Sequence, residues 1–209
     1  MSLPTIGIVK VPTTEAYRAN PSVINDALAI LSKAPGTLGQ WHDLGLQNPE
    51  YIYFVNAWES IAHRDAFAQD KETYTRVHQA INPAFDPTGP SWRYHVQFAV
   101  EPFKALDALV TELTVMQLKD GADSEQFKGM LRTLQDVLAE RLGGDVSARA
   151  WGVSFEDPRV FVACLGWMSL EASKAAAEQE KGIITCINQI LQLADVEAKH
   201  ATLTRYSGD

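Results

Sequence analysis

The sequence predicts an α+β fold made of two tandem βαββαβ repeats. The first observation is that the expected order of strands and helices occurs twice along the chain. The second is that the segment at residues 51–60, YIYFVNAWES, is similar to residues 160–169, VFVACLGWMS. A shift of 109 residues (167 − 58) places Trp58 on Trp167. We therefore predict a first repeat at residues 1–102 and a second repeat at residues 103–209.

Further identities occur at the same shift, and each element of the first repeat has local support. The shift pairs Thr5 with Thr114 and Lys10 with Lys119. Asn20 and Pro21 supply an N-cap and a first-turn proline for the first helix, and Ser60 is placed to cap the second. The predicted elements are a strand at residues 5–11, a helix that is stopped at 34–36, a hairpin of strands at 37–46 and 51–58, a helix at 60–81 and a strand at 92–100.

The second repeat shows the same order of elements. Asp123 and Gln126 have the spacing of a capping box. Apolar residues at helical spacing follow from Phe127 to Leu142, which predicts a long amphipathic helix. The predicted elements are strands at residues 111–119, 146–155, 159–167 and 196–206, with helices from 123 to 142 and from 170 to 193.

A four-stranded antiparallel sheet with both helices on one face, the ferredoxin-like arrangement, leaves its other face uncovered. Two such sheets can bury these faces against each other, with the helices outside. Fusion of the repeats in one chain makes this association intramolecular and raises its effective concentration. We therefore expect an intrachain α+β barrel.

Composition excludes several classes of function. The chain has 209 residues, of which 46% are hydrophobic and 21% charged, so a packed core is expected. The formal charge is −8 and basic residues are scattered, which argues against nucleic-acid binding. No apolar run is long enough to span a membrane. The first residues do not show the basic segment followed by an apolar segment that is typical of a secretion signal. We expect a cytoplasmic protein, active as a monomer or homodimer, whose partner is a small hydrophobic or aromatic ligand.

Cofactor and metal motifs are absent from the sequence. It contains no glycine-rich dinucleotide or phosphate loop and no histidine pair at metal-ligand spacing. Its two cysteines, Cys164 and Cys186, give no disulfide or zinc framework. We predict neither a bound cofactor nor a metal.

The two central segments resemble a known superfamily. The runs NPEYIYFVNAWESIAHRDAF and EDPRVFVACLGWMSLEASKAAA are similar to the hairpin of antibiotic-biosynthesis-monooxygenase-like, dimeric α+β barrel proteins, where the second strand leads directly into a helix. The resemblance covers both repeats. It implies the barrel fold and a set of activities that includes cofactor-independent oxidation of phenols, polyketide cyclisation, haem breakdown and ligand binding without turnover.

Polar residues confined to one repeat indicate a site. On the second strand of the hairpin, Asn56 and Trp58 share a face, and Asn56 replaces Leu165. On the next helix, Tyr74 and His78 are one turn apart and correspond to Ile183 and Ile187 of the second repeat. Because buried polar groups need partners, we hypothesise that the first repeat carries the site and the second is mainly a scaffold.

The site residues can be given roles for oxidation of a small aromatic or polyketide-type phenol. We predict His78 as the base, with Tyr74 and Asn56 stabilising the anion, as the catalytic residues. Trp58, His42 and His95 are predicted to bind substrate. His95 and His200 both fall in the last strand of their repeats and form a candidate symmetric pair.

Alternative interpretations remain at several of these positions. Ser60 and Ser169 are suited to act as structural N-caps, and Tyr74 and His78 could extend their tips into solvent. Haem breakdown is disfavoured because the first strand lacks the Asn that the resemblance requires. Ala68 also occupies the position where the resemblance requires a His. A cyclase of the same fold and a non-catalytic binding or stress-responsive protein stay open.

Overall fold

The computed structural model describes residues 3–142 and 146–208, and the chain forms two compact units. The first unit comprises Met1–Phe98 together with Ala201–Asp209, and the second comprises Ala99–His200. The last segment of the chain thus joins the first unit, although the sequence repeat suggested that it belonged to the second. No helix within the described ranges combines the length and apolar character needed to cross a membrane.

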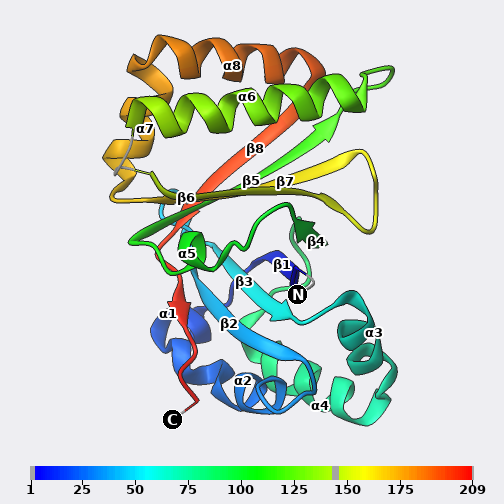
Figure 1. Cartoon of the computed structure of the whole chain (residues 1–209). Helices are drawn as coiled ribbons and strands as arrows, with labels where there is room; N and C mark the ends of the chain where they lie inside the picture. The colour runs from blue at the N-terminus through cyan, green and yellow to red at the C-terminus, as the bar shows by residue number, and fades with distance from the viewer. Residues whose placement is uncertain (1–2, 143–145, 209) are drawn as a thin grey trace. The chain divides into compact units, whose positions relative to one another are not determined.

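The first unit is a βαββαβ fold extended by one short C-terminal strand (Figure 1). Its sheet has the order β4-β1-β3-β2-β9, and each neighbouring pair is antiparallel. The elements are β1 Thr5–Pro12, α1 Glu15–Ala19, the 3-10 turn η1 Pro21–Ile24, α2 Asn25–Leu31, β2 Thr37–Leu44, β3 Tyr51–Trp58, α3 Ile61–Gln69, α4 Lys71–Ile81, η2 Asn82–Ala84, β4 Trp92–Phe98 and β9 Thr204–Arg205.

The second unit repeats this order with one long first helix. Its strands follow the order β8-β5-β7-β6, and α6 and α8 lie side by side over one face of them (Figure 1). The elements are α5 Phe103–Leu106, β5 Val110–Leu118, α6 Ser124–Leu142, β6 Val146–Ser154, β7 Val160–Trp167, α7 Leu170–Gln179, α8 Lys181–Leu193 and β8 Ala194–Ala201.

The predicted fold class is confirmed: the protein is α+β, with two consecutive βαββαβ units. The predicted caps are also found, because Ser60 Oγ accepts a hydrogen bond from the His63 amide and Ser169 Oγ accepts one from the Ala172 amide. One predicted helix is divided. Asp70 ends α3 and caps α4 by accepting from the Thr73 amide, which separates residues 61–69 from 71–81. The closure of both sheets into one barrel stays a prediction.

The constant shift between the repeats fails in the first strand. Thr5 lies opposite Trp58 on β3, whereas Val110 lies opposite Trp167 on β7, so β1 and β5 are related by a shift of 105 residues (110 − 5). The predicted pairing of Thr5 with Thr114 is therefore wrong, and Lys10 is not equivalent to Lys119. From the start of the first strand to the start of the second, the second repeat is four residues longer (36 against 32), which is about one helical turn.

Each unit has its own hydrophobic core between the sheet and its helices. In the first unit this core includes Trp58, Val77 and Ile81. In the second it includes Trp167, Ile183 and Ile190. Each unit thus has a layer of side chains in which a cavity can be enclosed between sheet and helices.

Candidate functional site

A cavity of about 120 Å³ lies between the sheet of the first unit and helices α3 and α4. Asn56 and Trp58 line it from β3, and Tyr74 and His78 line it from α4. His95 on β4 also lines it. The structure therefore brings together five of the six residues that the sequence suggested.

The strand and helix periods explain this convergence. Alternate residues of β3 point to the same face, so Asn56 and Trp58 face the helices. On α4, Tyr74 and His78 are separated by four residues, as are Val77 and Ile81, which places all four on one stripe of the helix. The two buried aliphatic members of this stripe, Val77 and Ile81, fix the helix on the sheet and hold its polar members at the cavity.

Asn56 presents an unsatisfied acceptor at this cavity. Its Oδ1 atom is the buried side-chain oxygen or nitrogen atom that lacks a hydrogen-bond partner within the described ranges. Such an atom carries a desolvation cost of about 1–3 kcal/mol. A ligand that donates a hydrogen bond to Oδ1 would remove that cost.

Tyr74 and His78 are in contact, with ring centroids 4.3 Å apart. Both side chains are half-buried and line the cavity, so their tips are not simply extended into solvent. Burial lowers the pKa of His78 below its ordinary value, and the positive charge of Arg93 lowers it further. His78 is therefore neutral at pH 7, which is the form that can accept a proton.

Arg64 is a cavity residue that the sequence analysis missed. Its Nε donates to His95 Nε2 at 2.9 Å, and its Nη2 lies 2.9 Å from His95 Nδ1. The His95 ring lies over Gly7, where an added Cβ would come within 3.1 Å of it. The available signal was its spacing: Arg64 precedes the cavity residues Phe67 and Ala68 by one turn of α3. Its Nη1 also forms an ion pair with Asp65 Oδ1 at 2.7 Å, so the positive charge that Arg64 brings to the cavity is partly balanced by this carboxylate.

His42, the sixth predicted residue, lies outside this cavity. It is buried on β2, and its Nδ1 is 2.6 Å from the hydroxyl oxygen of Tyr17. Burial lowers the pKa of His42 and raises that of Tyr17. This closed pair stabilises the packing of α1 on the sheet, and His42 is not placed to touch a ligand held by Asn56.

The second unit encloses a larger cavity at the equivalent place, with a volume of about 350 Å³. The register of the strands accounts for the difference. Phe54 of β3 corresponds to Ala163 of β7, and Tyr74 of α4 corresponds to Ile183 of α8, so aromatic side chains are replaced by smaller ones. The second repeat therefore has a pocket of its own, which the scaffold hypothesis did not include.

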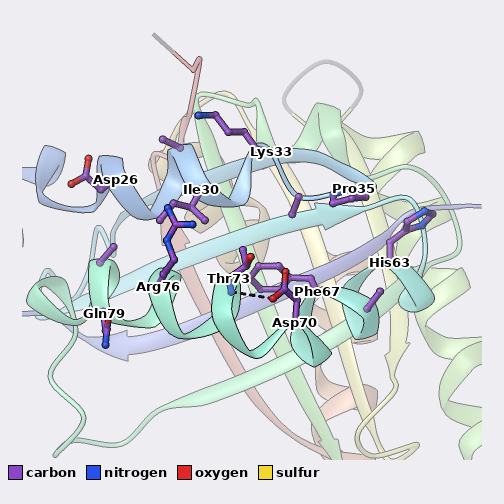
Figure 2. Close-up of a pocket in the computed structure, with 14 residues that line it drawn as sticks. Asp26, Ile30, Lys33, Pro35, His63, Phe67, Asp70, Thr73, Arg76 and Gln79 are labelled. Atoms are coloured by element: carbon purple, nitrogen blue, oxygen red, sulfur yellow. Dashed lines mark hydrogen bonds between the residues drawn. The ribbon is translucent and has the colours of Figure 1, made fainter.

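The first unit also has an open groove of about 940 Å³ between α2 and the α3–α4 pair (Figure 2). Charged residues that are exposed to solvent lie along it, among them Lys33, Asp70 and Arg76. Figure 2 shows the hydrogen bond by which Asp70 caps α4. Among the described residues that line the groove, no buried polar groups converge, so its size alone does not make it the candidate site.

No protein-family model matches the chain, and no curated protein matches its sequence. Among solved structures, the chain shares its fold with proteins that carry oxygenase-type names. A protein provisionally assigned as a monooxygenase from Lactobacillus acidophilus is 16% identical, with a TM-score of 0.66 over 98% of this chain and 94% of that one.

Two further solved structures extend this likeness. A provisionally assigned monooxygenase from Fusobacterium nucleatum has a TM-score of 0.69 at 10% identity, over 98% of this chain and 94% of that one. An anthrone oxidase-like protein has a TM-score of 0.73 at 9% identity, over 99% and 94% of the two chains. At these identities the comparisons establish a common fold across both units.

Proposed function

We propose that the protein is a cofactor-independent monooxygenase of the antibiotic-biosynthesis-monooxygenase-like type, which oxidises a small electron-rich phenol in the cavity of the first unit. The observation that carries the proposal is the convergence of a neutral His78, the unsatisfied Asn56 Oδ1 and the Arg64 guanidinium on one aromatic-lined cavity. The shared fold with oxygenase-named structures supports the same class.

The size and lining of the cavity favour a one-ring substrate. Its volume of about 120 Å³ is close to that of a protein cavity that holds one benzene ring, roughly 150 Å³. Trp58, Phe67 and Tyr74 form a continuous chain of ring contacts at this cavity, with centroids 5.3 Å and 5.8 Å apart. Aromatic faces of this kind accommodate a flat ring by offset or edge contacts.

The reaction begins with removal of the phenol proton by His78. The resulting phenolate is electron-rich at the carbon para to its oxygen, and the guanidinium of Arg64 and the Tyr74 hydroxyl stabilise its negative charge. Dioxygen adds at that carbon by taking an electron pair from the ring, and the protonated His78 returns a proton to give a hydroperoxide. Asn56 Oδ1 accepts the hydrogen bond of the hydroperoxide.

The products follow from the balance of atoms. Loss of the proton on the same carbon breaks the O–O bond, so one oxygen atom stays in the quinone and the other leaves as water. The phenol loses two hydrogen atoms and gains one oxygen atom, and dioxygen is the only oxidant. The protein supplies the base, the anion-stabilising donors and an aromatic-lined cavity that holds the ring.

Oxygen uptake with 2-methoxyphenol tests this function directly. Wild-type protein should consume dioxygen and form an equimolar amount of the methoxyquinone. His78→Ala should lower kcat/KM by about 10²–10⁴-fold, the usual contribution of a general base. Thr75→Ala, an exposed position on the same helix, is the matched control and should retain the wild-type rate.

Two outcomes would favour the alternative functions. Turnover that proceeds equally well under nitrogen would indicate a cyclase-type proton transfer instead. Binding of the phenol by both wild-type protein and His78→Ala, with no product from either, would indicate a ligand-binding protein. Either result would overturn the monooxygenase proposal.

A further inference from the structure

The second unit holds a buried polar cluster that the proposed function does not use. Glu112 on β5, Ser173 on α7 and His200 on β8 meet at one end of the 350 Å³ cavity. Only 15% of the Glu112 side chain and 9% of the His200 side chain are exposed. Charged groups are rarely buried to this extent unless they are paired.

The carboxylate of Glu112 is held by several donors. Oε2 accepts from Trp167 Nε1 at 2.8 Å and from Ser173 Oγ at 3.2 Å, and it lies 3.3 Å from His200 Nε2. Oε1 accepts from Thr114 Oγ1 at 2.8 Å. Burial acts to raise the pKa of Glu112, but the interactions with His200 and the hydrogen bonds from Thr114 and Trp167 outweigh it and lower the pKa. The group is an anion at neutral pH.

The same distances exclude a nucleophilic triad. Ser173 Oγ is 2.8 Å from His200 Nε2, the same ring nitrogen that faces Glu112. In a catalytic triad the carboxylate contacts the ring nitrogen that does not face the nucleophile, whereas Glu112 Oε2 and Ser173 Oγ face the same nitrogen of His200. The cluster is therefore a hydrogen-bonding end for a ligand, without an activated nucleophile.

Most of the other lining residues are aliphatic, and the exposed Lys174 and Glu178 of α7 also line the cavity. Leu131, Leu134 and Leu138 line it from α6, while Ile183 and Ile187 line it from α8. Leu191, which is 44% exposed, also lines it and places apolar surface where a ligand enters. A volume of about 350 Å³ lies within the usual range of ligand pockets, about 300–1,000 Å³.

We propose that the second unit binds a medium-chain aliphatic primary alcohol, with its chain among the leucine and isoleucine side chains and its hydroxyl donating to Glu112 Oε1. An ionised carboxylate can accept about four hydrogen bonds, and Oε1 accepts one from Thr114, so one more donor can be accommodated there. A hydroxyl has one donor and matches this capacity. An ammonium group has three donors to satisfy, and a fatty-acid carboxylate would bring a second negative charge beside Glu112.

This site is independent of the phenol cavity. None of its lining residues belongs to the first unit, and its chemistry depends on Glu112, which corresponds in register to Gly7 of the first repeat. Failure of phenol oxidation would not affect it, and the two proposals can be tested separately.

The test uses octan-1-ol and octanoate as probes of the full-length protein, by isothermal titration calorimetry at pH 7. Octan-1-ol should bind, with amide chemical-shift changes at Ile183 and Ile187, and octanoate should bind at least about tenfold more weakly because of charge repulsion. Ala163→Phe, which installs the residue of the first repeat, should weaken octan-1-ol binding by at least about tenfold because the ring fills the cavity.

The charge of Glu112 is tested by Glu112→Gln, with Glu125→Gln as the control. Glu125 is exposed on α6 and pairs with Lys128, so its variant should preserve the preference for the alcohol. Glu112→Gln should bring the affinities for octan-1-ol and octanoate close together. Equal binding of both probes by the wild type, or unchanged alcohol binding by Ala163→Phe, would overturn the proposal even if Glu112→Gln does not fold.

Discussion

Replacement of Glu112 by Gln is expected to destabilise the second unit substantially. The carboxylate accepts three hydrogen bonds, from Thr114, Trp167 and Ser173, and lies beside His200. An amide keeps one acceptor oxygen and replaces the other with an NH₂ group, which faces donors. Loss of one charge-assisted hydrogen bond costs about 1.5–3 kcal/mol. The NH₂ group of the new amide also faces a neighbouring donor, which adds to this cost.

The expected loss is therefore about 2–4 kcal/mol of unfolding free energy at pH 7. Urea unfolding followed by far-UV circular dichroism measures it, with Glu125→Gln as the surface control. That control should change stability by no more than about 0.5 kcal/mol. A loss below about 1 kcal/mol for Glu112→Gln would refute the reasoning, because it would mean that the buried donors do not depend on the carboxylate.

The difference in unfolding free energy between wild type and Glu112→Gln should also depend on pH. The pKa of Glu112 is lowered in the folded state. The contribution of its carboxylate to the unfolding free energy is therefore complete above the pKa of an unfolded Glu, about 4.3. It is lost as the pH falls through the lower folded value, where the folded carboxylate also becomes protonated. The stability difference between wild type and Glu112→Gln should shrink from pH 6 towards pH 3. A difference that is constant over this interval would contradict the assignment.

Three further predictions follow from the geometry. Because the pKa of His78 is lowered, kcat/KM for phenol oxidation should fall on the acid side with a midpoint below about 6.5, and a midpoint above neutrality would exclude His78 as the base. Ser60→Ala and Ser169→Ala should each lower the unfolding free energy, measured with urea, by about 1 kcal/mol because an N-cap is lost. No change would show that the caps do not stabilise their helices. Gly36→Ala should lower the unfolding free energy more than Gly121→Ala by at least about 1 kcal/mol, because both glycines have positive φ but only a Cβ at position 36 would meet a side chain, that of His63. Equal losses would refute the predicted clash.

Much of the fold could be predicted because its signals are local. Strand alternation, helical spacing and the caps at Ser60 and Ser169 each depend on residues within one or two turns. Asn56, Trp58, Tyr74 and His78 could be brought together for the same reason, since one strand face and one helix stripe determine where they point. These local periods are independent of how the rest of the chain is arranged.

The features that were missed depend on register between distant segments. The strand pairing relates Glu112 to Gly7 by a shift of 105 residues (112 − 7). The shift of 109 found in the sequence does not align these two residues. The return of β9 to β2 joins residues far apart in sequence, which no local pattern encodes. A signal for Glu112 was nevertheless present, because it is the single charged residue of β5, and a charged group on a largely buried strand indicates a buried partner.

The central claim is that the first unit inserts one atom of dioxygen into a phenol without a cofactor. Oxidation of 2-methoxyphenol under isotopically labelled dioxygen, followed by mass spectrometry of the quinone, tests it most directly. The account predicts one labelled oxygen atom in the quinone formed by wild-type protein, and almost no labelled product from His78→Ala. A quinone whose new oxygen is unlabelled, or labelled product formed equally by both proteins, would contradict it.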